Sequence, residues 1–323
     1  MSQDAPAYLG IDLGGTNIQC GVWQDDKLLA RDGAKTKADG GAEAVIGRIV
    51  KLTDKVLEAA SMKRSEIAGL GIGAPGAIDV SKGVVLRAPN LGWEDYPLEK
   101  VLEKETGLRV AVDNDVNAGA WGEYKAGVAQ GYDHMVAIFV GTGIGGGLVL
   151  DGKLHHGHYG TAGEIGFVSV APGLPPGQRG LEDFASRTNV VRTIVKLIES
   201  GHDSVVTELV DGDYSRVRSK VLSQAYKADD PLTVDVVDHA AVLVGTAAAS
   251  TVTLLSLNAV VLGGGLTEAI GKPWVQKVRK TFDQLVYPDQ LRDCKVLAST
   301  LEDDAGVVGA ALLAAAKLEA AAP

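Results

Sequence analysis

The segment GIDLGGTN, at residues 10–17, lies between two apolar runs and decides how the chain around it folds. It places an acid, two adjacent glycines, a threonine and an asparagine in what should be a short hydrophobic hairpin. Glycine lets backbone N–H groups approach a ligand closely, and successive N–H groups in a tight turn form a concave site for anions. Phosphate is the usual ligand of such a site, so the segment predicts a phosphate-binding hairpin.

The pattern returns in VGTGIGGGLVL, at residues 140–150, where a glycine turn with a threonine again joins two apolar runs. The two segments form a weak internal repeat about 125 residues apart, far longer than the period of a solenoid. Either turn alone is equally consistent with an ordinary glycine-rich hairpin. Neither is a Walker A loop or a Rossmann fingerprint, because no Gly-Lys-Ser/Thr follows and each joins strand to strand. Together they predict two duplicated halves that hold the phosphates of one nucleotide.

Strands and amphipathic helices alternate along both halves. The apolar residues of segment 43–60 recur near the helical period of 3.6, which predicts a helix with one buried face. Further helices are predicted at residues 116–127, 188–200, 202–230, 234–256 and from 305 onward. Strands are predicted at residues 8–12, 18–24, 27–35, 69–79 (ending in a Gly/Pro loop), 109–115, 134–140, 144–150, 153–154, 259–262 and 295–300, with a further helix between the last two. This alternation indicates an α/β fold.

Two domains are expected from 323 residues of which 46% are hydrophobic, at roughly 100–200 residues per domain. No linker rich in Pro or Ser separates the halves, so we place the boundary at a helix or hinge near residues 118–130. The expected domains are residues 1–122 and 123–323, and the final helix, from Ala305, is free to pack back on the first domain. Residues 240–266 are long and apolar enough to span a bilayer, but their Ala, Ser and Thr content favours a buried helix followed by a buried strand.

The charge and the cysteines limit the functions to be considered. With a formal net charge of −10, the chain offers no basic surface for nucleic acid or for an anionic membrane. Cys20 and Cys294 form neither a disulfide framework nor a cluster with metal-ligand spacing. Residues 1–8 have no basic region followed by an apolar core, so no signal peptide is expected. We therefore expect a cytoplasmic protein that contacts neither nucleic acid nor membrane.

The glycine turns supply the expected nucleotide site. Asp12 would hold Mg²⁺ through water, because Mg²⁺ keeps most of its waters and takes few carboxylates. A third glycine run, at residues 263–265, follows an apolar strand and would let adenine and ribose lie against bare backbone, although a plain strand-to-helix turn fits equally well. The candidate nucleotide and phosphate ligands are Asp12, Gly14, Gly15, Thr16, Asn17, Gly141, Thr142, Gly143, Gly263, Gly264 and Gly265.

Six motifs occur in a specific order: the three glycine elements, GAPGAID and AVDNDVN between the first two, and GEIG after the second. In this order they resemble the sugar kinases of the ROK family (repressor, open reading frame, kinase), and within it the bacterial glucokinases. The resemblance extends from Tyr8 to the DDAGVVGAALLA tail. It implies the actin-like, ribonuclease H-like ATPase fold, with two α/β domains that each carry a mixed five-stranded sheet and close a cleft on ATP and sugar. It also implies that the protein converts ATP and D-glucose to ADP and D-glucose 6-phosphate. Relatives of this kind are commonly dimers, so a homodimer is expected.

Asp115, in VDNDVNA, matches the general base that takes a proton from the sugar hydroxyl in this family. A carboxylate between a strand end and a helix start lies at a cleft edge, and an ordinary pKa near 4 would keep it ionised at pH 7. Asp113 is expected to be a helix cap or turn residue. The resemblance implies that sugar hydroxyls are bound by Asn90, Asn114, Asp115, Glu164 and Glu182; a turn role for Asn90 and a surface role for each glutamate are the alternatives.

The sequence departs from the family in one segment. Family members commonly carry a His after GEIG and then a Cys-rich segment, which together hold a structural zinc. Here Phe167 takes the His position, and residues 171–182 (APGLPPGQRGLE) contain no cysteine. Because a tetrahedral zinc site needs four thiolate or imidazole ligands, no zinc is expected, and the three prolines of the segment are expected to stiffen the loop instead.

His155, His156 and His158 form a histidine cluster that the family motifs do not explain. We expect a loop beside the sugar pocket rather than a metal site. The alternatives for the substrate are N-acetylglucosamine, N-acetylmannosamine and fructose, with polyphosphate as a remote alternative donor. A sugar-sensing regulator is disfavoured, because only nine residues precede Gly10 and a DNA-binding domain would not fit there. The GEIG and NDVN motifs disfavour a chaperone or cytoskeletal ATPase.

Overall fold

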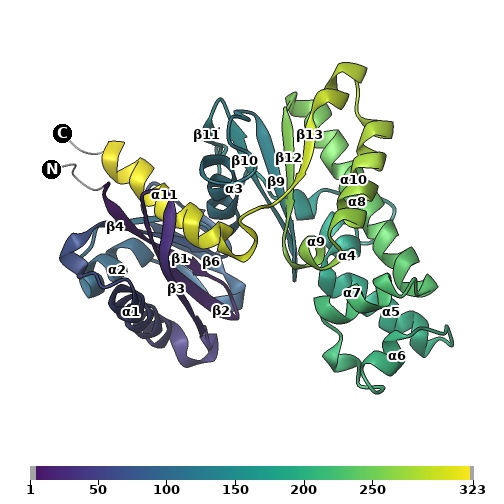
Figure 1. Ribbon diagram of the computed structural model, residues 1–323, viewed down its shortest axis with the longest axis horizontal. Coiled ribbons are helices and arrows are strands. Elements are labelled where there is room, and N and C mark those ends of the chain that lie inside the picture. Colours follow the sequence, from purple (N-terminus) through teal and green to yellow (C-terminus); the bar gives the residue numbers. More distant parts are fainter. Residues whose placement is uncertain (1–4, 321–323) are drawn as a thin grey trace.

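The computed structural model describes residues 5–320, which form two halves that each contain a five-stranded sheet (Figure 1). The first sheet has the strand order β3-β2-β1-β4-β8, and the second has the order β11-β10-β9-β12-β13. In each sheet an antiparallel meander pairs with parallel strands, so both sheets are mixed. The predicted α/β architecture with two mixed five-stranded sheets is confirmed.

Successive side chains of the first sheet point to opposite faces, and a layer of helices covers each face. Its strands are β1 (Ala7–Leu13), β2 (Asn17–Gln24), β3 (Lys27–Lys35), β4 (Ile67–Ala74) and β8 (Val110–Asn114). Leu9 and Ile11 of β1 are buried in one cluster with Val45 and Ile49 of helix α1 (Gly41–Ala59). The intervening residues of β1 face the C-terminal helix α11 (Ala305–Ala320) on the opposite side. This follows from the two-residue period of a strand.

Close approach of α11 to the first sheet depends on glycine. A Cβ atom at Gly10 of β1 would collide with the carbonyl oxygen of Val307, and one at Gly71 of β4 would collide with that of Ala310. With hydrogen at both positions, the last helix of the chain packs directly on β1 and β4, as Figure 1 shows in yellow. The C-terminal helix thus completes the layer over the N-terminal sheet.

A small third sheet was not predicted. It contains β5 (Ala77–Asp79), β6 (Val84–Ala88) and β7 (Trp93–Tyr96), and helix α2 (Leu98–Thr106) follows it. The sequence predicted a Gly/Pro loop at the end of β4, but the last three residues of GAPGAID form β5. Strands of three to five residues carry too few alternations to produce a periodic signal.

The second sheet carries mainly helices on its outer side. Its strands are β9 (Met135–Val140), β10 (Ile144–Leu150), β11 (Lys153–Leu154), β12 (Ala259–Gly263) and β13 (Lys295–Ala298). Its helices are α4 (Leu181–Ala185), α5 (Arg187–Glu199), α6 (Val206–Leu209), α7 (Ser219–Lys227), α8 (Pro231–Leu255), α9 (Gly265–Ile270) and α10 (Lys272–Leu285). The predicted helical segment 202–230 corresponds to α6 and α7.

Helix α8 is the one helix among residues 5–320 that is long and apolar enough to span a membrane, and half of its most apolar window is buried inside the protein. Val237, Val244 and Val252 are buried in the core of the second half, where α8 packs against α10. The prediction of a buried helix followed by a buried strand is confirmed by α8 and β12.

Helix α3 (Asp115–Lys125) connects the two sheets, because it follows β8 and packs against β10 and α11. A Cβ atom at Gly309 of α11 would collide with the carbonyl oxygen of Ala118, so the two helices are in backbone contact. The buried Glu123 carboxylate accepts hydrogen bonds from Ser299 Oγ and from the backbone N–H of Leu301, just before α11. These contacts hold α3 at the junction of the two halves.

Candidate active site

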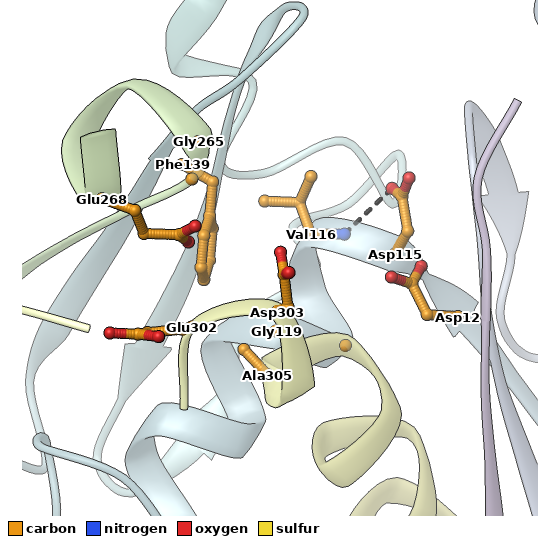
Figure 2. A pocket seen from close by; sticks show the side chains of 12 residues that line it. Asp12, Asp115, Val116, Gly119, Phe139, Gly265, Glu268, Glu302, Asp303 and Ala305 are labelled. Carbon is orange, nitrogen blue, oxygen red and sulfur yellow. Dashed lines mark hydrogen bonds between the residues drawn. The ribbon is translucent and has the colours of Figure 1, made fainter. Parts of the chain in front are cut away.

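Two neighbouring cavities lie where the two halves meet. The first, of about 490 Å³, is lined by Asn90, Asn114 and Asp115 of the first half and by the second glycine turn, Glu164, Phe167 and Glu182 of the second. The second, of about 220 Å³, is lined by Asp12, Asp115, Gly264, Gly265, Glu268, Glu302, Asp303 and Gly306, among others (Figure 2). Asp115 lines both cavities. A group bound in one cavity would therefore meet a group bound in the other next to the Asp115 carboxylate.

The position of Asp115 results from the turn between β8 and α3. Asn114 caps α3, because its Oδ1 accepts hydrogen bonds from the N–H groups of Val116, at 2.9 Å, and Asn117, at 3.2 Å. Asp115 Oδ1 also accepts from Val116 N, at 2.9 Å. Burial raises the pKa of Asp115 to about 6, and the charge of Glu164 adds to this effect. The prediction of an ordinary pKa near 4 was wrong, because desolvation disfavours the ionised carboxylate.

Asp12, the next-to-last residue of β1, lies beside Asp115 (Figure 2). Burial raises the pKa of Asp12 to about 7, and the charge of Asp115 raises it further than burial alone would. Two half-buried carboxylates side by side favour a cation between or near them, and oxygen ligands are those that Mg²⁺ prefers. Among residues 5–320, no three His, Cys, Asp or Glu side chains are placed to hold a metal directly. The acidic pair therefore fits a hydrated Mg²⁺, which Asp12 would hold through water.

The second glycine turn is held in place from three sides. Gly141 N donates to the carbonyl of Gly143 across the turn, and Glu182 Oε2 accepts from Ile144 N at 2.6 Å. Thr188 Oγ1 donates to the carbonyl of Thr142 at 2.7 Å. A Cβ atom at Gly143 would collide with the Glu182 carboxylate and displace it from its bond to Ile144. Glu182 lines the larger cavity, as expected of a sugar ligand, but it also fastens the glycine turn.

Arg187 is a site residue that the sequence analysis missed. Its Nη2 donates to Thr142 Oγ1 at 2.8 Å, and its backbone N–H donates to the carbonyl of Gly141 at 2.9 Å. Its guanidinium also lies beside Gly265. Arg187 opens α5, where a cation is unfavourable next to the positive end of the helix dipole. That unfavourable position is the signal that could have identified it as a functional residue.

The first glycine turn takes less part in the two cavities than expected. Gly14 N donates to the carbonyl of Asn17 and closes the turn, and Asn17 Oδ1 accepts from Lys35 Nζ at 2.8 Å. Gly15 lies beside Asn90, which lines the larger cavity. Of residues 10–17, Asp12 is the one that lines either of the two cavities as described. The other nucleotide ligands predicted in this turn do not line either cavity: Gly14, Gly15, Thr16 and Asn17.

The third glycine run divides into two roles. Gly264 and Gly265 line the smaller cavity. Gly263 is buried in β12, where a Cβ atom would lie 2.7 Å from the ring of Phe139. Gly263 thus allows the Phe139 ring to pack closely on β12. Gly264 has a φ of 86°, a backbone conformation that favours glycine.

Two further predictions concern side chains near Asp115. Asp113 is not a helix cap: the cap is Asn114, and the Asp113 carboxylate is buried and bonded to His156. Asn114, expected to bind sugar, uses its carbonyl oxygen for the cap and donates one amide hydrogen to the carbonyl of Gly76 at 3.2 Å. The second amide hydrogen of Asn114 is not used in these bonds, and Asn114 lines the larger cavity.

The loop that lacks the family cysteines is closed by its own backbone. Val170 N donates to the carbonyl of Arg179 at 2.8 Å, and Leu181 N donates to that of Val168 at 2.9 Å. These bonds bring the two ends of the proline-containing segment together. Phe167, at the position where the family commonly has His, is 74% exposed and lines the larger cavity.

Comparison with known proteins agrees with this geometry. The sequence profile of the ROK family matches residues 8–317. The chain is 34% identical to a glucokinase of Halalkalibacterium halodurans over 94% of this chain and 93% of that one, and 35% identical to a glucokinase of Thermotoga maritima over 94% and 95%. The structure of a ROK family glucokinase from Streptomyces griseus, in complex with glucose and AMPPNP, superposes with a TM-score of 0.86 at 32% identity, covering 96% of this chain and 99% of that one. The chain therefore belongs to the ROK family.

Proposed function

We propose that this protein is an ATP-dependent glucokinase, which transfers the γ-phosphoryl group of ATP to the 6-hydroxyl of D-glucose. The observation that carries the proposal is the position of Asp115, a half-buried carboxylate that lines both cavities at the junction of the two halves. The similarity to glucokinases of two bacteria supports glucose as the acceptor. The Streptomyces griseus structure, whose ligands are glucose and AMPPNP, supports ATP as the donor.

In this proposal the nucleotide occupies the smaller cavity. Gly264 and Gly265 offer bare backbone to the adenosine. The phosphates would extend from there toward the larger cavity, where the Thr142 turn forms part of the lining and is supported by the Arg187 guanidinium. Asp12 would hold Mg²⁺ through water; when bound, this ion neutralises charge on the phosphates. Phosphoryl transfer has a loose transition state with charge spread over the γ-phosphoryl oxygens, so the protein mainly positions the reactants and stabilises that charge.

The sugar occupies the larger cavity. Glu164, Glu182 and the side-chain amides of Asn90 and Asn114 face it and provide both acceptors and donors for hydroxyl groups. Asp115 accepts the proton of the attacking 6-hydroxyl. Its pKa of about 6 leaves it mostly ionised at pH 7, yet closer to the operating pH than an exposed aspartate, which favours general base catalysis.

The cavity that receives the donor favours a nucleotide over polyphosphate. Glu268, Glu302 and Asp303 line it together with Asp12, and Figure 2 shows Glu268 and Asp303 pointing into it. A long polyanion would be repelled by these carboxylates, whereas adenine and ribose offer them N–H and O–H donors. N-acetylglucosamine, N-acetylmannosamine and fructose remain the alternative acceptors, and a cytoplasmic homodimer remains the expected form of the enzyme.

The test is a hexose panel with ATP, in which ADP release is coupled to a colour change and kcat/KM is measured for each sugar. D-glucose is expected to give the highest kcat/KM, and polyphosphate in place of ATP is expected to give little product. ADP release without sugar should be slow, because water must be excluded from the phosphoryl group. A higher kcat/KM for either N-acetylated sugar or for fructose would overturn the choice of glucose, and no sugar-dependent ADP release at all would overturn the kinase.

A further inference from the structure

The carboxylate of Asp113 is fully buried, although it lies two residues before the proposed base, Asp115. Its two oxygens lie 2.9 and 3.1 Å from His156 Nε2. Lys317 Nζ of α11 lies 3.4 Å from one of them and donates to the carbonyl of Val112 at 2.8 Å. Lysine and histidine thus reach this carboxylate from two segments that are far apart in the sequence.

Asp113 is ionised and acts only as an acceptor. Burial by itself would raise the pKa of Asp113, but the hydrogen bond from His156 and the charge of Lys317 outweigh burial, and the pKa falls below its usual value. Because a carboxylate has no proton to give, Nε2 of His156 must carry the hydrogen of this bond. Hydrogen bonds to a buried charge are strong, because the local dielectric is low. The Asp113 carboxylate therefore restricts the positions of the groups that donate to it.

The same carboxylate organises the turn that carries the base. Asp113 Oδ1 accepts from the backbone N–H of Asn114 at 2.9 Å and from the side-chain amide of Asn117 at 3.2 Å. These two asparagines flank Asp115 on either side. The direction of the Asp115 side chain therefore depends on the bonds made by Asp113.

His156 belongs to the other half of the molecule. It follows β11 of the second sheet, whereas Asp113 lies in β8 of the first. The carbonyl of His156 accepts from Ala162 N at 3.1 Å, which closes the loop that leads directly to Glu164. A continuous path of hydrogen bonds and short chain segments thus connects the base, Asp115, to the proposed sugar ligand, Glu164.

We propose that His156 and Asp113 form a positioning pair between the two halves, which sets Asp115 against the segment carrying Glu164 so that the sugar hydroxyl meets the base. This inference rests on the proposed function, because it concerns the alignment of the sugar site. His156 touches no substrate in it: the imidazole acts through Asp113 and through its own loop.

The histidine cluster provides matched controls. His155 and His158 lie within two residues of His156, yet both are exposed. The ring of His158 packs against that of Tyr159, with centroids 4.6 Å apart. Replacing either histidine changes the composition of the same loop without touching Asp113.

The experiment compares His156→Ala, His156→Gln, His155→Ala and His158→Ala in the full chain, with kcat and KM measured for sugar and for ATP. His156→Ala should lower kcat/KM for sugar about ten- to hundredfold, through both kcat and KM, because a misplacement near 1 Å has effects of this size. The KM for ATP should stay within about twofold, since the nucleotide cavity does not contain this loop. His156→Gln, which keeps an N–H donor, should restore most of kcat/KM, and the two control variants should match the wild type.

A double-mutant cycle with Asp113→Asn measures the coupling between His156 and Asp113 apart from the other contacts of each residue. The double variant should be no worse than the poorer single variant, because both changes remove the same contact. A His156→Ala variant that melts at a lower temperature but keeps the wild-type kcat and KM for sugar would reduce the pair to a structural role and overturn the inference. If the wild-type protein itself phosphorylates no sugar, the proposed function fails instead.

Discussion

The carboxylate of Asp12 lies beside that of Asp115 at the meeting point of the two cavities (Figure 2), and burial raises the pKa of the first to about 7 and of the second to about 6. The pair brings an acid from the first glycine hairpin next to an acid from the turn between β8 and α3. Each carboxylate resists ionisation in the absence of a cation. This relationship governs the pH dependence and the stability of the protein as well as its chemistry.

Asp115→Asn should lower kcat for sugar phosphorylation by about 10²- to 10⁴-fold, the usual contribution of a general base. Binding of a non-hydrolysable ATP analogue, measured by calorimetry with Mg²⁺ present, should persist because the glycine elements are unchanged. A variant with near-normal turnover would remove Asp115 from the role of base.

The acid limb of the pH profile of kcat/KM for sugar should have its midpoint near pH 6. The pKa of Asp115 is raised to about 6, so the carboxylate becomes protonated and unable to accept a proton as the pH falls through that value. Initial rates between pH 5 and pH 8 at limiting sugar and saturating ATP test this. A limb centred near pH 4 would show that the carboxylate behaves as an exposed one does.

Asp12→Asn and Asp115→Asn should each stabilise the protein at pH 8 in a buffer without Mg²⁺. Because both pKa values are raised above the unfolded value of 3.8, the stability linked to these groups is present below about pH 4 and is lost as the pH rises through 6 and 7. The expected gain is about 1–3 kcal/mol in the free energy of unfolding, since each pKa unit corresponds to about 1.4 kcal/mol. Urea unfolding at pH 8 should show the gain, and at pH 4.5 it should shrink markedly; an equal gain at both pH values would contradict the explanation.

Arg187→Ala should raise the KM for ATP about tenfold or more, because a hydrogen bond involving a charged group contributes about 1.5–3 kcal/mol. The guanidinium supports Thr142 of the second glycine turn and lies close to Gly265. Arg192→Ala, on the exposed face of the same helix, is the control and should leave the KM unchanged. Equal KM values for all three proteins would place Arg187 outside the nucleotide site.

Gly309→Ala should destabilise the protein by about 1–3 kcal/mol, the typical cost of overpacking, because its Cβ would collide with the carbonyl of Ala118 where α11 meets α3. Gly47→Ala should instead stabilise it by about 0.5–1 kcal/mol, since this exposed glycine inside α1 has no neighbour within 4 Å of the added Cβ. Denaturant unfolding of the two variants compares the same chemical change in two helices. A similar shift for both would show that the contact between α11 and α3 is loose.

Patterns within single elements were sufficient to predict most of the fold. The glycine hairpins, the alternating strands around them and the helical period of residues 43–60 depend on neighbours in the sequence, so they were readable without coordinates. Helices α2 and α4 and the strands β5 to β7 escaped prediction, and the three strands are short and lie between turns. Their pairing depends on contact with one another, and each alone carries too little pattern.

The sequence by itself determined that the chain is an α/β protein with two similar halves, and it placed Asp115 at the junction of a strand and a helix. Only the tertiary structure decided that Asp12 and Asp115 share one buried space, that Arg187 supports the turn at Thr142, and that Asp113 bonds to His156, 43 positions away. The physical reason is that periodicity and turn chemistry act between neighbours along the chain. Burial, charge and hydrogen bonding between distant residues arise only where the two sheets and the helices between them meet.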